Sequence, residues 1–199
     1  MKKVERSEVL GLAEYERIRE PFRARVIAEK RLRRTPLGAR ASCVFENRDT
    51  VLLQIQEMLR TERITREAAV QHEVDTYNEL VPGPHELSAT VFVEILDKEE
   101  RERFLAEAKG LERAFALEID GERCPAKNDP NREFADRTTA VHYLKFALTE
   151  RAERALRDVL ERKRKASEVE VVVLADHAAY AARARLAPEA VLSVAEDLA

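Results

Sequence analysis

The chain has 199 residues, of which 45% are hydrophobic and 37% charged, and its formal net charge is −3 at pH 7. This length suits one domain, and the composition indicates a globular but heavily charged protein. Only 5 Gly and no Trp are present, which argues against a loop-rich or nucleotide-cradling architecture.

The N-terminal stretch MKKVERSEVLGLAEYERI contains no apolar core of the kind that a secretory signal requires. No segment approaches the roughly 20 apolar residues of a membrane-spanning helix. We therefore expect a cytoplasmic protein with no membrane contact. In that reducing compartment, Cys43 and Cys124 are expected to be free thiols.

The first 38 residues predict a pair of helices, which is either part of the domain or an appendage to it. Ser7 can cap the first helix, and Pro21 can begin the second, because a proline in the first turn has no N–H to lose. Pro36 and Gly38 are expected to end it. The second helix is rich in basic residues, namely Arg19, Arg23, Arg25, Lys30, Arg31, Arg33 and Arg34. Such a face is typically solvated and ion-paired. The alternative is nucleic-acid binding, which the lack of interleaved aromatic residues disfavours.

The clearest helix signature lies in FENRDTVLLQIQEMLRTERI, residues 45–64, directly after a short strand predicted over residues 40–45. Asn47 or Asp49 can cap this helix. Glu62 returns to the apolar side, so either the helix has ended there or Glu62 meets a cation. The apolar stripe that predicts a core-facing helix consists of Val51, Leu52, Ile55, Met58 and Leu59.

The remaining chain alternates between strand and helix patterns. Strands are predicted over residues 87–96, 114–119, 122–126, 139–148, 168–174 and 183–186. Helices are predicted after Thr65, over 97–109 and 149–165, and after Pro188. Asp120-Gly121 gives the strongest hairpin signal, and residues 128–136 predict a polar loop. With no repeat and no linker, the pattern predicts a single α+β domain over residues 1–199. It should contain an antiparallel or mixed sheet with helices packed mainly on one face.

The candidate site residues lie at the turn before the central helix and on its border. Glu46, Asn47, Arg48 and Gln56 either form the solvated start of a capped core helix or line a polar pocket. His142 lies on a strand that is apolar on both faces, so it is expected to be buried. It is either a core histidine satisfied by one hydrogen bond or an acid–base group that faces Glu46 or Arg48. The second interpretation would make the protein an enzyme.

Motifs of known chemistry are absent from the chain. It contains no Cys-x-x-Cys, no glycine-rich phosphate loop, no Gly-x-Ser-x-Gly and no helical Glu-x-x-His. The sequence therefore predicts no metal and no cofactor and favours a non-catalytic protein. It does not decide the ligand or the oligomeric state.

Three segments carry a resemblance to a known family. FENRDTVLLQIQEMLR resembles the signature of a bacterial family catalogued as domain of unknown function 3501. LAEYERIREPFRARVIAEKRLRR and TTAVHYLKFAL are similar to its N-terminal and strand motifs. The resemblance covers most of the chain, and the family has no established activity. It implies a genetic setting beside rubrerythrin and a heterodisulfide-reductase-like iron–sulfur protein. On that basis we expect an accessory or ligand-binding protein of a redox-stress system, with a protein of either kind as its partner.

Overall fold

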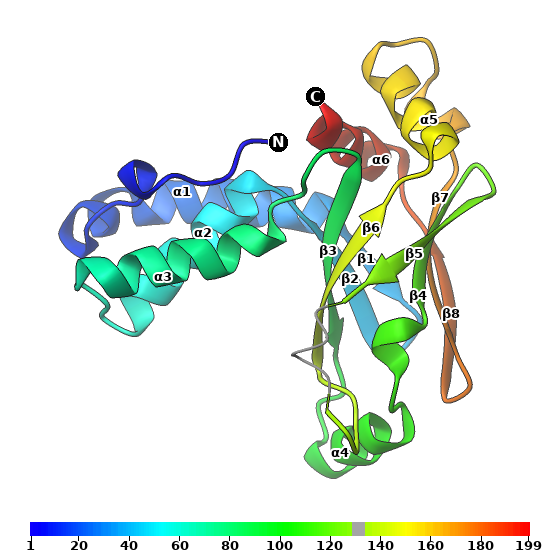
Figure 1. The fold of residues 1–199 in the computed structure, drawn as a ribbon, viewed down its shortest axis with the longest axis horizontal. Coiled ribbons are helices and arrows are strands. Elements are labelled where there is room, and N and C mark those ends of the chain that lie inside the picture. The colour runs from blue at the N-terminus through cyan, green and yellow to red at the C-terminus, as the bar shows by residue number, and fades with distance from the viewer. Residues whose placement is uncertain (129–133) are drawn as a thin grey trace.

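A computed structural model describes residues 1–128 and 134–199 of the chain. Its strands form one eight-stranded sheet in the order β1-β2-β3-β6-β5-β4-β7-β8, and each strand is antiparallel to its neighbours. The sheet rolls up until the two edge strands lie side by side (Figure 1). The strands are β1 (Arg34–Leu37), β2 (Ala41–Glu46), β3 (Glu86–Val93), β4 (Phe115–Ile119), β5 (Glu122–Lys127), β6 (Val141–Ala147), β7 (Val171–His177) and β8 (Tyr180–Arg185).

The seam between β1 and β8 nearly closes the barrel. Across it, the hydroxyl of Tyr180 donates a hydrogen bond to the carbonyl oxygen of Leu37. Gly38, which follows β1, has φ +69°, and a Cβ on it would lie 2.8 Å from that hydroxyl. A residue without a side chain is therefore needed where the seam closes.

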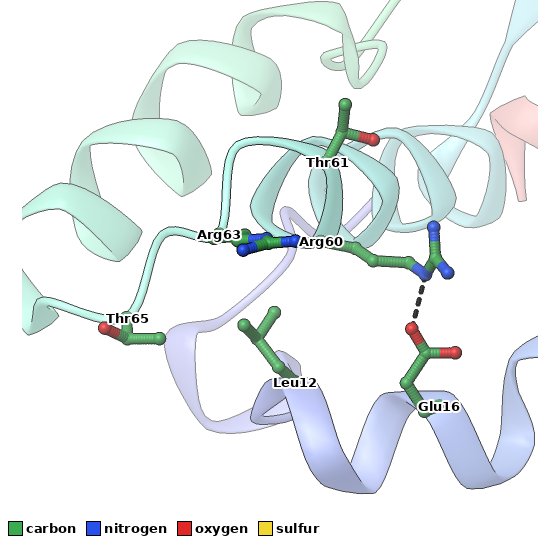
Figure 2. A pocket seen from close by; sticks show the side chains of 6 residues that line it. All are labelled: Leu12, Glu16, Arg60, Thr61, Arg63 and Thr65. Atoms are coloured by element: carbon green, nitrogen blue, oxygen red, sulfur yellow. Dashed lines mark hydrogen bonds and ion pairs between the residues drawn. The ribbon is translucent and has the colours of Figure 1, made fainter.

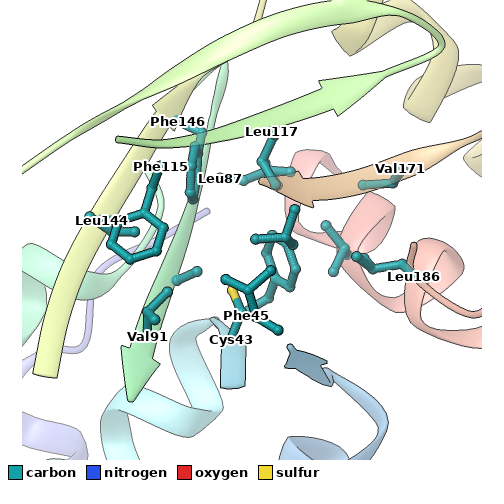
Figure 3. Packing of buried hydrophobic residues seen from close by; sticks show 14 of the residues in the cluster. Cys43, Phe45, Leu87, Val91, Phe115, Leu117, Leu144, Phe146, Val171 and Leu186 are labelled. Carbon is teal, nitrogen blue, oxygen red and sulfur yellow. The ribbon is translucent and has the colours of Figure 1, made fainter. Parts of the chain in front are cut away.

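The main hydrophobic core fills the barrel. Successive side chains of a strand point to opposite faces, so alternate residues point inward. Figure 3 shows inward-facing side chains from strands around the barrel meeting in one cluster. The labelled residues are Cys43, Phe45, Leu87, Val91, Phe115, Leu117, Leu144, Phe146, Val171 and Leu186.

Three helices cover the two ends of the barrel. α5 (Glu150–Leu160) and α6 (Pro188–Ala195) lie near one end, and α4 (Lys98–Glu107) lies at the other (Figure 1). Each places apolar residues in the barrel core, including Leu156, Val191 and Phe104. The expectation that helices pack mainly on one face of the sheet is not met. A rolled sheet encloses its inner face, and what remains to be covered is its two open ends.

The other three helices form an arm that projects from the side of the barrel (Figure 1). They are α1 (Leu12–Leu32), α2 (Arg48–Thr61) and α3 (Glu67–Tyr77), and α2 packs against both of the others. The arm has its own hydrophobic core, formed by Val4, Val9, Val51, Ile55, Leu59, Val70, Val74 and Val81. The arm thus has a hydrophobic core of its own, separate from the core of the barrel.

The predicted pair of N-terminal helices is not observed. α1 runs without a break from Leu12 to Leu32 and carries Pro21 in its interior. Proline removes one helical hydrogen bond. Tyr15 and Val26, on either side of Pro21 in the chain, are nevertheless both buried and hold the helix against the rest of the molecule. The helix also ends earlier than expected, because β1 begins at Arg34. Pro36 lies within β1, and a proline is tolerated in this strand because β1 is at the edge of the sheet.

Most of the other predicted elements are confirmed. The hairpin signal at Asp120-Gly121 corresponds to the β4–β5 turn, and the central helix is α2, capped by Asn47. α2 ends at Thr61, so Glu62 lies beyond it as an exposed C-cap residue. Residues 129–133 of the predicted polar loop lie outside the described residues. In the part of the chain that the structure covers, no helix is both long and apolar enough to cross a membrane.

Candidate functional site

The Glu46 carboxylate is the centre of a buried polar cluster where the arm meets the barrel. Glu46 is the last residue of β2, and its side chain points away from the barrel core, on the same face as Val44. Its Oε2 accepts a hydrogen bond of 2.5 Å from the Thr50 hydroxyl, and its Oε1 accepts one of 2.7 Å from the Thr90 hydroxyl. The Lys30 ammonium lies 3.9 Å away. Both oxygens are therefore satisfied within the chain.

Asn47 links this carboxylate to the start of α2. Its side-chain oxygen accepts from the Thr50 backbone N–H at 3.0 Å, and the Thr50 hydroxyl accepts from the Asn47 N–H at 2.9 Å. The two residues thus satisfy each other's free donors, as in a capping box. The Asn47 amide also donates to Glu29 of α1. Asn47 is used entirely for capping and for joining two helices.

A buried ion pair lies beside this cluster. Arg33 and Asp197 form a salt bridge, and their side chains are only 1% and 2% exposed. The Arg33 guanidinium also donates to the carbonyl oxygens of Phe45, Glu46 and Ser193 at 2.9–3.2 Å. Burial raises the pKa of Asp197 to about 6, and the Arg33 charge opposes that rise. The pair connects the end of the arm, the end of β2 and the C-terminal segment.

Arg48 and Gln56 serve a different contact. The Arg48 guanidinium pairs with Glu8, and both hydrogen-bonding ends of the Gln56 amide bind the Leu10 backbone, at 2.7 and 3.2 Å. These two side chains therefore attach the N-terminal segment to α2. The structure does not bring them to the Glu46 carboxylate.

His142 lies on the opposite face of the sheet from Glu46. It is level with Val91 of β3, which is level with Cys43 of β2, so these three side chains share the inward face. Glu46 is three residues from Cys43 and therefore faces outward. The His142 ring lies 5.3 Å from the Phe115 ring. The predicted grouping of His142 with Glu46 and Arg48 is thus not formed.

The environment of His142 keeps its ring neutral. Burial lowers its pKa to about 4, whereas the Glu112 charge and a hydrogen bond with the Thr139 backbone act in the opposite direction. Its Nε2 is buried and has no hydrogen-bond partner in the described chain. Cys43 on the same face has a thiol pKa raised to about 12 by burial. Neither side chain is prepared for acid–base or nucleophilic chemistry at neutral pH.

The polar cluster is a buried structural junction between the arm and the barrel. Glu46, Asn47 and Arg33 all have partners within the chain, and each is at most 9% exposed. Among residues 1–128 and 134–199, no three or more His, Cys, Asp or Glu side chains are grouped so that they could hold a metal ion. The arrangement fixes the arm to the barrel by charge-assisted hydrogen bonds.

An open pocket lies elsewhere, between α1 and the connection from α2 to α3. It has a volume of about 510 Å³ and is lined by Leu12, Glu16, Arg60, Thr61, Arg63 and Thr65 (Figure 2). Sequence reasoning did not identify these residues as a site, because they come from three segments with no motif in common. Arg60 pairs with Glu16, whereas Arg63 has no acidic partner among the residues that the structure describes.

Fold and site together define an α+β protein built from a nearly closed antiparallel barrel and a helical arm joined by a buried polar cluster. The chain belongs to the family described as protein of unknown function DUF3501, whose sequence profile matches residues 3–198. It is similar to the crystal structure of a novel protein of unknown function from Burkholderia pseudomallei, with 32% sequence identity, a TM-score of 0.88 and full coverage of both chains. No curated protein matches the chain.

Proposed function

We propose that this protein is a non-catalytic accessory protein that binds a protein partner through the outer face of α1. The observation that carries this proposal is the exposure of α1. This helix has 21 residues, yet only Tyr15 and Val26 are buried. A helix at the surface of a globular protein normally buries a continuous apolar stripe of three to four residues per two turns. Most of the surface of α1 is thus available for contact.

The exposed face of α1 has an apolar centre. Ile18 and Leu32 are each 44% exposed, and seven-residue steps through Arg25 place them on one line along the helix. Pro21 and Ala28, also exposed, lie between them on the same side. Large apolar side chains arranged in this way on an exposed helix are typical of a protein contact surface.

Basic residues outnumber acidic ones on this side of α1, where Glu14 is also exposed. Arg17 and Arg31 are exposed and have no ion pair within the described chain, and Arg25 pairs with Asp49 at 2.5 Å. This charge favours a partner with an apolar centre and acidic residues around it. The family resemblance supports a rubrerythrin-type or iron–sulfur redox protein as that partner, in a bacterial cytoplasm.

The test is a binding measurement with purified partners of both kinds, by calorimetry or biolayer interferometry. Ile18→Glu and Leu32→Glu should weaken binding at least tenfold, because they place a carboxylate in the apolar centre. Leu192→Glu is the matched control, since Leu192 is 45% exposed but lies on α6. Equal affinity for all three variants would refute the surface. An absence of binding by every redox partner would refute the proposed setting.

Nucleic-acid binding by the basic segment is a weaker alternative. Of its seven basic residues from Arg19 to Arg34, six already have an acidic partner within the described chain, and only Arg31 has none. Binding a phosphate backbone would compete with those pairs. Retention on immobilised DNA or RNA that falls steeply with salt would favour this alternative over the protein partner.

A further inference from the structure

The N-terminal segment, residues 1–10, runs along the arm ahead of α1 (Figure 1). It contains one short 3-10 turn, η1 (Arg6–Glu8), and otherwise lies outside helices and strands. Among the residues that the structure describes, no hydrogen bond joins the backbone of this segment to the backbone of the rest of the chain. The segment is therefore held to the arm by side chains and not by secondary structure.

Two buried side-chain amides of the arm bind the backbone of this segment. The Asn78 amide accepts a hydrogen bond from the Val4 N–H and donates one to the Val4 carbonyl oxygen, both at 2.8 Å. The Gln56 amide binds Leu10 in the same way, at 2.7 and 3.2 Å. An amide that pairs with both backbone groups of one residue does not read the side chain of that residue. These two contacts fit the backbone of any peptide that takes the same position.

Two apolar side chains anchor the segment. Val4 and Val9 are both buried, and they pack with the apolar residues of α2 and α3 in the arm core. Ser7 lies between them in the chain and is exposed. The surface of α2 and α3 under the segment therefore takes apolar side chains at two positions.

Two ion pairs select the charges between those anchors. The Arg6 guanidinium binds both carboxylate oxygens of Glu67 on α3, each at 2.8 Å. Glu8 pairs with the Arg48 guanidinium on α2. Ion pairs at the edge of a contact contribute more to its specificity than to its affinity. The arm thus binds the segment through the parts that peptide-binding sites use, which are backbone hydrogen bonds, apolar anchors and charge pairs.

We propose that this surface of α2 and α3 is a peptide-binding site, which the protein fills with its own N-terminal segment, and that an equivalent segment of a partner protein replaces it. The preferred sequence has an apolar residue, Arg two positions later, Glu four positions later and a second apolar residue five positions later, as in VERSEV. This site lies apart from the outer face of α1, and its test needs no redox partner.

The attachment of the segment to the same chain sets how tightly a partner binds. A ligand on a short flexible linker has an effective concentration on the order of mM, so it competes strongly with a free peptide. A partner's apparent affinity is lowered by the fraction of molecules in which the site is filled internally. Weakening the internal segment should therefore tighten the binding of an added peptide.

The first experiment measures the fluorescence anisotropy of a labelled peptide with the sequence of residues 1–11, MKKVERSEVLG, mixed with the full-length protein. We expect Val9→Ser to bind this peptide roughly tenfold more tightly than the wild type, because its internal segment has lost one buried apolar side chain. Ser7→Ala is the matched control, since Ser7 is exposed, and it should bind as the wild type does. Equal affinities of all three proteins would overturn the proposal.

A second substitution tests the position of the bound peptide. Asn78→Ala, added to Val9→Ser, removes both hydrogen bonds to the first anchor residue and should weaken peptide binding roughly tenfold. Undiminished binding would overturn the assignment of the site.

Hydrogen exchange of the wild type tests the release of the segment without any substitution. The N–H groups of Val4 and Leu10 should exchange faster than those in the middle of α2, because the segment opens while the arm stays folded. Equal protection would mean that the segment leaves only when the arm unfolds, and it would overturn the proposal. A dimeric wild type would overturn the assignment to a partner protein, because the segment would then be exchanged between two copies.

Discussion

The buried His142 predicts how the stability of the protein depends on pH. Its pKa is about 4 in the folded protein against 6.5 for an unperturbed histidine, because burial penalises the charged ring. The unfolded chain therefore binds a proton at His142 in a range where the folded chain does not. In that range the free energy of unfolding falls as the pH falls. The loss begins near pH 6.5 and is complete near pH 4.

The size of the effect follows from the two pKa values. One pKa unit corresponds to about 1.4 kcal/mol, so the contribution of His142 to stability declines by about 2 kcal/mol at pH 5 and about 3 kcal/mol at pH 4. Other groups also titrate in this range, so a comparison between variants is needed. His142→Leu replaces the ring with an apolar side chain and removes the titration.

The assay is urea unfolding of both proteins at pH 7.5, 6, 5 and 4.5, followed by circular dichroism. The difference in unfolding free energy, wild type minus variant, should become more negative by about 2 kcal/mol between pH 7.5 and 5. The variant is therefore expected to tolerate acid better, whatever its stability at neutral pH. A difference that stays constant across this range would show that the ring is not held neutral in the folded protein.

Three further results are expected. Arg33→Met should lower the free energy of unfolding by about 3–5 kcal/mol in urea titrations, because it leaves the buried Asp197 without its cation; a loss under 1 kcal/mol would contradict a structural role for the pair. Tyr180→Phe should cost about 1–3 kcal/mol in the same assay, since a buried carbonyl at the barrel seam loses its donor; unchanged stability would mean that the seam does not depend on this bond. Burial raises the pKa of the Cys43 thiol to about 12, and it also raises the pKa of the Cys124 thiol. Neither thiol should react with Ellman's reagent at pH 8 until urea is added, and rapid labelling of the native protein would refute this.

The local elements of the fold could be predicted from the sequence because their signals are local. The apolar stripe at helical spacing identified α2, and Asp120-Gly121 located the β4–β5 turn. The sequence offered Asn47 and Asp49 as caps of α2, and the structure shows the cap to be Asn47. The alternation of side chains along a strand likewise places Glu46 and Cys43 on opposite sides of β2. Each of these signals depends on residues within a few positions of one another.

Local rules were insufficient where a contact from elsewhere in the chain changed the outcome. Pro21 predicted a helix boundary, but buried residues on both sides of it keep α1 continuous. Pro36 was expected only to end a helix, and it lies instead in an edge strand that completes the barrel. Packing of the buried residues offsets the helical hydrogen bond that Pro21 removes. At Pro36, the edge position of β1 means that a missing N–H is tolerated.

The candidate site was decided by the pairing of strands. The sequence by itself placed Glu46 beside Asn47, the cap of α2, and the structure shows that both are joined to Thr50. The sequence could not show whether His142 lies on the same face of the sheet as Glu46. That depends on β3 lying between β2 and β6 and on the register in which these strands pair.

The tertiary structure alone also produced the arm pocket, which joins residues of α1, α2 and the connection to α3. Local periodicity determines which residues form helices and strands, since neighbouring residues share the same backbone geometry. The closure of the barrel, the face on which a histidine lies and the position of the arm pocket depend on contacts between residues far apart in the chain. The free energies that select those contacts depend on the packing of the whole molecule.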